Sequence, residues 1–139
     1  MATFNVCTCF YTDSGLEVHQ LNTDTVKAAL TAHLPEVGDT VWSEANFPPP
    51  TNANGYTAGG HDTTNVFSAG KMTGTDIVIT ATAGGLGPFR YAVLYNDTSA
   101  TDALIGWYAY ASEITVASGE TFTIDFDAAN GIVTIGAPA

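Results

Sequence analysis

Hydrophobic residues alternate with polar residues in several short stretches of this chain. The cleanest alternation is at residues 120–126, where Phe122, Ile124 and Phe126 are separated by Thr and Asp residues. Successive side chains of a strand point to opposite faces, so this pattern predicts a strand with its aromatic face inward and Asp125 in solvent. Weaker patterns rich in β-branched and aromatic residues predict further strands at residues 4–11, 61–68, 76–83 and 132–135.

Two runs in the second half of the chain, RYAVLY at 90–95 and LIGWYAY at 104–110, are apolar on both faces. Strict alternation divides the second run into Leu104, Tyr108 and Tyr110 on one face and Ile105, Trp107 and Ala109 on the other. The second apolar face of such a hairpin must meet another sheet, a covering loop or another subunit. A partner surface is therefore the first functional hypothesis. With the proline run, its expected residues are Tyr91, Val93, Tyr95, Trp107, Tyr108, Tyr110, Pro48, Pro49 and Pro50.

Residues 25–34, TVKAALTAHL, fit two local structures. The composition favours a helix, with Thr23 or Asp24 as its N-cap. The same residues alternate as a strand would, with Val26, Ala28 and Leu30 against Lys27 and Thr31. Pro35 ends either element.

Residues 35–60 show hardly any periodicity and contain three consecutive prolines, so we expect one long Pro/Gly-rich loop. Loops of this length in compact domains are commonly functional or bound to a partner. Many short strands between Gly, Asn and Asp turns predict an all-β fold, either an antiparallel β-sandwich or a jelly-roll-like barrel. We expect a single domain of residues 1–139, in which residues 1–20 form an N-terminal strand or an arm for contact between subunits.

The charge of the chain excludes several classes of partner. Fourteen acidic residues against three basic ones give a net charge of −11 over 139 residues. Nucleic acid and anionic membrane surfaces repel such a protein, whereas the same charge favours solubility at high local crowding. The start of the chain lacks the basic and apolar regions of a signal peptide, and no stretch has the roughly 18 apolar residues of a membrane span. We expect synthesis in a reducing cytoplasm.

Candidate chemistry is sparse, and we expect no enzyme, cofactor or metal. Cys7 and Cys9 would share one strand face near the distance limit for a disulfide, and buried free thiols are the favoured interpretation over an intermolecular bridge. Asp125 and Asp127 would lie roughly 7 Å apart on one strand, which could serve a glycosidase or a calcium site but is explained by an outward polar face. The remaining polar candidates have no ligand spacing or adjacent nucleophile: His19, His33 and His61.

An ordered set of phrases resembles a family of small virion structural proteins from tailed bacteriophages. The family pattern runs from DT(I/V)K-x-A-L to GYTAGG, RYAV(I/L)Y-x-DT, PLI-x-(W/Y), G-x-x-(F/L)-T-I-x-(F/W) and a closing GI. The matching stretches are residues 24–30, 55–60, 90–98, 103–107 and 119–132. The resemblance implies that residues 24–32 form a strand. The start MATFNVCTCF and the proline run at 48–50 depart from the pattern.

The resemblance implies a capsid decoration, or cement, protein that is made in the host bacterial cytoplasm, binds the major capsid protein on the outer shell and stabilises it. Closed capsid symmetry then implies self-association, with a trimer preferred over a dimer. One alternative is a tail- or fibre-associated virion component, or a small glycan-binding module that uses Trp42, Tyr56 or Trp107 as stacking platforms. A third class, a small hydrolase, would depend on Asp125 and Asp127.

Overall fold

The largest sheet of this computed structural model has six antiparallel strands, and the structure describes residues 2–16 and 18–134. Five strands follow the order β1-β9-β8-β2-β4, and β3 pairs with β8. The large sheet comprises β1 (Thr3–Val6), β2 (Val26–Thr31), β3 (Asn52–Ala53), β4 (His61–Asp62), β8 (Leu86–Asn96) and β9 (Leu104–Val116). The predicted all-β, antiparallel fold is confirmed.

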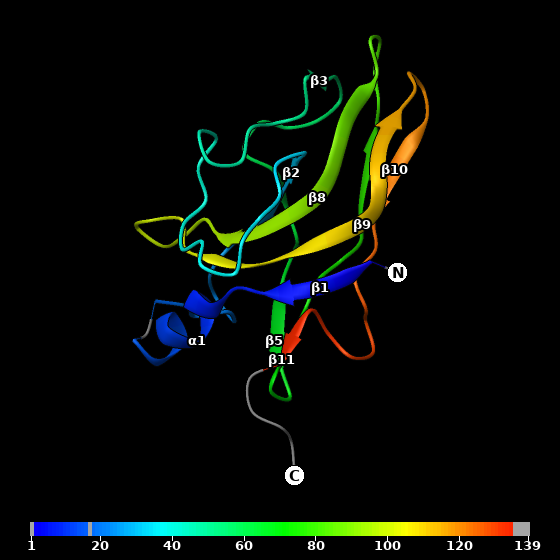
Figure 1. Cartoon of the computed structure of the whole chain (residues 1–139). Coiled ribbons are helices and arrows are strands. Elements are labelled where there is room, and N and C mark those ends of the chain that lie inside the picture. The colour runs from blue at the N-terminus through cyan, green and yellow to red at the C-terminus, as the bar shows by residue number, and fades with distance from the viewer. Residues whose placement is uncertain (1, 17, 135–139) are drawn as a thin grey trace.

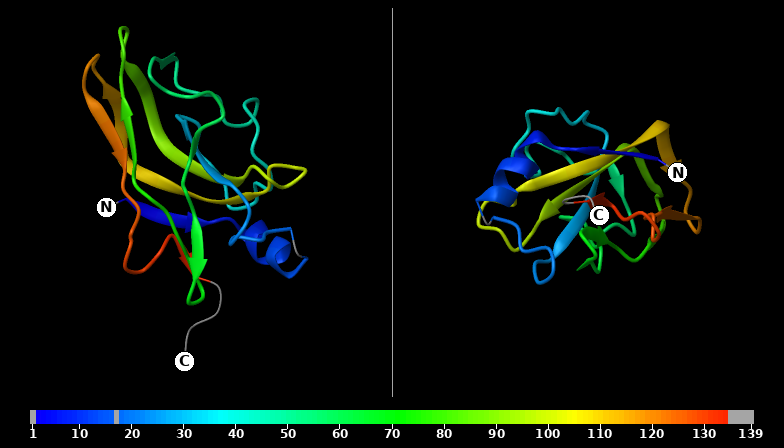
Figure 2. Two further views of the ribbon diagram at one scale, coloured as in Figure 1. Left: turned by 180° about the vertical axis from the view of Figure 1, so that it is seen from behind. Right: turned by 90° about the horizontal axis from the view of Figure 1, so that it is seen from below.

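Two smaller sheets pack on one face of the large sheet (Figures 1 and 2). One sheet pairs β7 (Ile77–Thr80) with β10 (Thr121–Ile124). The other has the order β11-β6-β5, formed by Val133–Thr134, Lys71–Thr73 and Val66–Ser68. A single buried cluster joins all three sheets and forms the main core; it includes Val26, Leu30, Met72, Ile79, Phe89, Leu94, Ile105, Tyr108, Ile124, Phe126 and Val133. The choice between a sandwich and a jelly-roll-like barrel stays a prediction.

The ambiguous segment at 25–34 forms the central strand β2, Val26–Thr31. Its neighbours are β8 on one edge and β4 on the other, with Ala29 opposite Val93. Five of its six residues are buried, because the strand has apolar layers on both faces. All six residues of β2 pair with β8, two of them also pair with β4, and Leu30 N–H donates to the Tyr56 hydroxyl. These tertiary contacts override a modest helix propensity. The strand interpretation is confirmed.

A β-bulge in the hairpin of β8 and β9 corrects the predicted faces of the LIGWYAY run. Tyr95 pairs with Leu104 and Leu94 pairs with Gly106, so Ile105 is an extra residue in β9. One extra residue exchanges the two faces of a strand. Leu104 therefore lies on the side of Trp107, and Ile105 lies in the main core with Tyr108. The assignment from strict alternation was wrong for these two positions.

The predicted N-terminal strand is shorter than expected, because the helix α1 (Thr8–Gly15) follows β1. The N–H of Cys7 still donates to Ile105 O at 2.9 Å. The next turn of the chain is helical, and Phe10 N–H donates to Cys7 O. Cys7 and Phe10 are both fully buried, and a helical spacing of three residues turns both side chains inward. Of the two predictions for residues 1–20, a strand is found at Thr3–Val6, where it pairs with β9 of the same chain.

The predicted strand at 61–68 is divided between two sheets. The break lies at Thr63–Asn65, where Thr63 directs both its N–H and its hydroxyl to Val26 O and Thr64 has a φ of 51°. The strand β6 that follows was not predicted. The strands expected at 76–83, 120–126 and 132–135 are present in shorter form, and Ile135 lies outside the described residues.

Candidate functional site

The second apolar face of the large sheet is covered by the chain itself. We define the outer cluster as the buried residues on this face: Cys7, Ala29, Phe47, Tyr91, Val93, Tyr95, Leu104 and Trp107. The predicted 35–60 loop is interrupted by the two-residue strand β3; it supplies Phe47, which is 2% exposed, and Trp42 packs at the edge. In Figure 1 the loop, drawn in cyan and teal, runs beside β8 on the side away from β10. The sequence allowed another sheet, a covering loop or another subunit on this face. The structure shows the covering loop.

The proposed partner surface is therefore corrected for its aromatic residues. Tyr91, Val93, Tyr95 and Trp107 lie beneath the loop. Tyr108 is buried in the main core instead, with its ring 4.9 Å from that of Phe4. These side chains offer no surface to a partner in the folded chain, because folding already removes them from water. The sequence revealed the two apolar faces but not which segment covers the second one.

The other four residues of the predicted surface are differently placed. Pro48 and Pro49 are exposed at the outer side of the loop, whereas Pro50 is buried beneath it. Tyr110 is half-buried, and its ring meets that of Phe122 edge-on at 5.3 Å. The exposed part of the covering loop continues N-terminally through three further residues: Glu44, Ala45 and Asn46. We call residues 44–49 without the buried Phe47 the outer ridge.

Three of the sequence phrases singled out above meet in space. β2 of the first phrase pairs with β8 of the RYAVLY phrase over six residue pairs. The GYTAGG phrase is joined to both strands, since Leu30 N–H donates to the Tyr56 hydroxyl at 3.0 Å and the Tyr95 hydroxyl donates to Gly59 O. Burial raises the pKa of Tyr56 to about 12, which keeps this phenol neutral. The three phrases form one structural unit.

The basic side chains are occupied within the chain. Lys27 lies 3.2 Å from the Asp97 carboxylate, and Lys71 donates to Ala129 O. Arg90 donates to the carbonyl oxygens of Tyr110 and Ala111 at 2.9 and 3.3 Å. These three cations lie on different elements and form no continuous basic surface against fourteen acidic residues.

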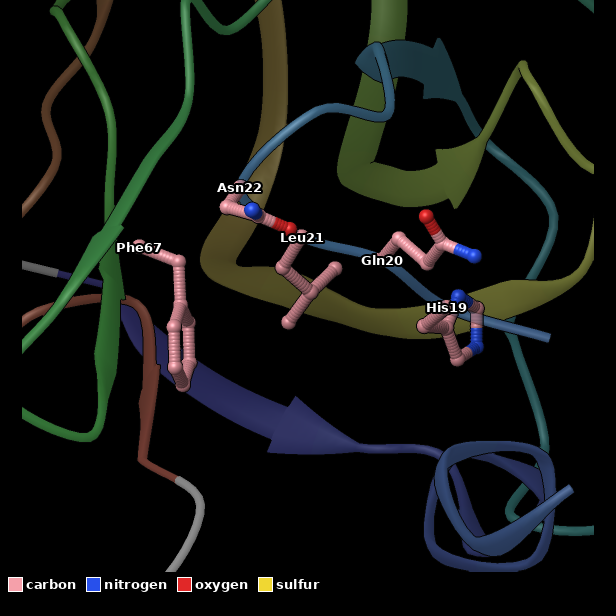
Figure 3. A pocket seen from close by; sticks show the side chains of 5 residues that line it. All are labelled: His19, Gln20, Leu21, Asn22 and Phe67. Carbon is pink, nitrogen blue, oxygen red and sulfur yellow. The ribbon is translucent and has the colours of Figure 1, made fainter. Parts of the chain in front are cut away.

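A hollow of about 270 Å³ lies between the 19–22 segment and β5 (Figure 3). Leu21 and Phe67 approach it from these two segments, and His19 lies at its other end. The Asn96 amide nitrogen donates to Asp24 Oδ2 at 2.7 Å and bonds His19 Nδ1 at 3.0 Å. Burial lowers the pKa of His19. This arrangement links three segments and provides no nucleophile beside the imidazole.

The positions of the two candidate carboxylates, Asp125 and Asp127, are explained by the fold. Asp125 is exposed, as predicted for its strand face. Asp127 caps a turn by accepting the backbone N–H groups of Ala129 and Asn130, and the hydrogen bonds from Asn130 lower its pKa. In the part of the chain that the structure describes, no cluster of three or more His, Cys, Asp or Glu side chains could hold a metal ion. No helix among those residues has the length and apolar character of a membrane span.

Comparisons with protein-family models, with curated proteins and with solved structures find no match to this chain.

Proposed function

We propose that this chain is a non-enzymatic structural protein of a tailed-bacteriophage particle, which decorates the outer surface of the capsid and stabilises it. The main support is one observation. Three stretches that resemble the phage family, residues 24–30, 55–60 and 90–98, are far apart in the sequence but are hydrogen-bonded to one another in the fold. Residues that build a shared scaffold need this mutual contact, whereas chance matches in sequence do not. The resemblance therefore concerns the framework of the domain.

The contact with the major capsid protein is made by the outer ridge. Its exposed prolines lose little conformational freedom on binding, because the ring already fixes the backbone. Glu44 lies on the same ridge, and the net charge of −11 favours a partner surface that carries Lys or Arg. Self-association into a trimer, or in the alternative a dimer, would place several ridges on neighbouring capsid subunits.

The tail- or fibre-associated role is the second candidate within the same class of particle. Its glycan-binding form lacks support from the aromatic residues, because Trp107 is only 7% exposed and the ring of Trp42 is stacked on Tyr95. A stacking platform for a sugar needs a free aromatic face.

Copy number in purified particles separates the capsid and tail roles. Quantitative mass spectrometry of the phage that encodes this chain should find hundreds of copies per particle. A few copies, or a few tens, would assign the protein to the tail or fibres and overturn the capsid role.

Rebinding to particles stripped of the protein tests the ridge. Pro49→Glu should weaken binding, because it adds a charge and chain flexibility at the contact, and raised salt should weaken the binding of the native protein as well. The matched control is Ala117→Glu, which adds the same charge at an exposed position in the turn between β9 and β10. Equal binding of both variants would remove the ridge from the interface.

A further inference from the structure

The two cysteines of the chain lie together at the junction of β1 and α1. Cys7 has an extended backbone, with φ −68° and ψ 137°, and Cys9 lies in the first turn of the helix. The side chains of residues i and i+2 on a strand share a face, but their Cα atoms are about 6.5–7 Å apart. The start of the helix turns the second side chain back, so that the two Sγ atoms are 2.7 Å apart.

We propose that Cys7 and Cys9 are a redox modification site, at which an intramolecular disulfide forms when the protein leaves a reducing environment. A disulfide has an S–S length of about 2.05 Å, so the two sulfur atoms need to approach by less than about 1 Å. Both thiols are free in this structure. This inference is independent of the proposed virion function.

The two thiols differ in their access to an oxidant. Cys7 is completely buried in the outer cluster, and its N–H is held by Ile105 O. Cys9 is half-buried and lines a surface hollow of about 320 Å³ between α1 and residues 37–40. A small disulfide can therefore enter at Cys9, while Cys7 is placed to displace it.

The chemistry is a pair of thiol–disulfide exchanges with a small disulfide such as glutathione disulfide. The Cys9 thiolate attacks one glutathione sulfur, which forms a mixed disulfide and releases the first reduced glutathione. Cys7 sulfur then attacks Cys9 sulfur, which forms the S–S bond of the protein and releases the second. The protein loses two protons and two electrons, and the oxidant gains both to become two thiols.

The surroundings of Cys9 make the first step slow at neutral pH. Burial raises the pKa of Cys9, as does the hydrogen bond that its thiol donates to Cys7 Sγ, and the charge of Asp13 acts in the same direction. Because the thiolate is the attacking species, the rate should increase as the pH rises. In a reducing environment the two thiols stay reduced, and they are oxidised slowly once the protein leaves that environment.

Oxidation also changes a contact with the covering loop. The Cys7 thiol lies 2.5 Å from its acceptor, Asp39 O, and the Cys9 thiol lies 3.5 Å from Leu104 O. A disulfide has no S–H group, so Asp39 O loses the Cys7 thiol as its donor. The bond therefore fixes the β1–α1 junction and releases one attachment of the loop at Asp39.

The test uses the full-length native protein in glutathione buffers of graded redox ratio, followed by acid quenching, denaturation, alkylation and intact-mass measurement. We expect a monomer that has lost two hydrogen atoms and takes up no alkylating agent. A parallel titration in denaturant should need about tenfold more oxidising conditions, because only the fold holds the thiols together. Two alkylated thiols at every ratio, a lasting glutathione adduct, a covalent dimer or equal behaviour in denaturant would each overturn the proposal.

Single-cysteine variants test the order of the two steps. Cys7→Ala should keep glutathione on Cys9, because the resolving thiol is gone. Cys9→Ala should resist the reagent while folded, since the remaining thiol at Cys7 is fully buried. Rapid labelling of Cys9→Ala, with circular dichroism showing a folded protein, would contradict the assigned roles. The wild-type titration decides the proposal even where a variant fails to fold.

Discussion

The ring of Trp42 lies flat on the ring of Tyr95, with centroids 4.4 Å apart and planes only 5° from parallel. The same tyrosine donates its hydroxyl to Gly59 O at the other end of the covering loop. Burial raises the pKa of Tyr95, which keeps its hydroxyl a donor. Tyr95 of β8 therefore anchors the loop at two points, Trp42 and Gly59, which are 17 residues apart in the sequence.

Trp42→Ala should detach the N-terminal part of the covering loop from the sheet. We expect a loss of about 2 kcal/mol in the free energy of unfolding, because a half-buried ring loses its stacking partner and its buried area. The exposed outer cluster should then bind a hydrophobic dye, and urea unfolding gives the energy. Trp42→Phe keeps a stacked ring and should lose less than half as much. Equal losses for the two variants would contradict the role of stacking.

Gly60→Ala should destabilise the contact of the GYTAGG phrase with β2. Gly60 has a φ of 98°, and a Cβ at this position would lie 2.5 Å from Ala28 O, a backbone atom of the central strand. Strain and clash together should cost about 2 kcal/mol or more, measured by thermal and urea unfolding. Gly38→Ala is the control, since a Cβ there meets nothing within 4 Å, and its effect should stay within about 0.5 kcal/mol.

Substitutions along residues 120–126 should rank by burial. Phe126→Ala should cost about 3–5 kcal/mol because its ring is 3% exposed. Phe122 is half-buried against Phe89, so its truncation should cost about 2 kcal/mol. Asp125→Asn, at an exposed position, should be nearly silent in the same unfolding measurement. A larger effect of Asp125→Asn than of Phe126→Ala would mean that the register is wrong.

Stability should decrease as the pH falls through the histidine range. Burial lowers the pKa of His19 below that of the unfolded chain, about 6.5, against an opposing effect of Asp13 and Asp24. Between the two pKa values the unfolded state binds more protons, so stability is full above about pH 6.5 and is lost as the pH falls toward the folded pKa. Burial lowers the pKa of His61 as well, with the same sign.

The melting temperature measured from pH 8 to pH 4.5 checks this dependence. His19→Gln should flatten the curve below about pH 6.5, because the group that takes up the proton in the unfolded chain is gone. An unchanged slope in His19→Gln would assign the pH dependence to other groups.

How far the sequence predicts the fold depends on the range of the interactions that decide each element. The strand at residues 120–126 is predicted because alternation is a local property, and the structure places Ile124 and Phe126 inward. The helix that begins after Cys7 was missed, since its turn follows from burying Cys7 and Phe10 beneath other elements. The extra residue Ile105 was missed because a bulge leaves no mark in a run that is apolar on both faces.

The candidate site shows the same division. Three prolines and a lack of periodicity identified the covering loop, yet its buried anchor Phe47 had only a weak local signal, an aromatic residue directly before Pro48. The partly buried network of Asn96 with His19 and Asp24 joins residues more than seventy positions apart, and a single sequence carries no sign of it.

By itself, the sequence determined the all-β class, the apolar hairpin with two faces to cover, the acidic surface and the long loop. These follow from composition and short-range periodicity, which each segment carries alone. Only the tertiary structure decided that the loop of the same chain covers the second face and that Cys7 Sγ meets Cys9 Sγ. The physical reason is that burial is a property of two surfaces in contact, and the partner of each surface is set by how the whole chain folds.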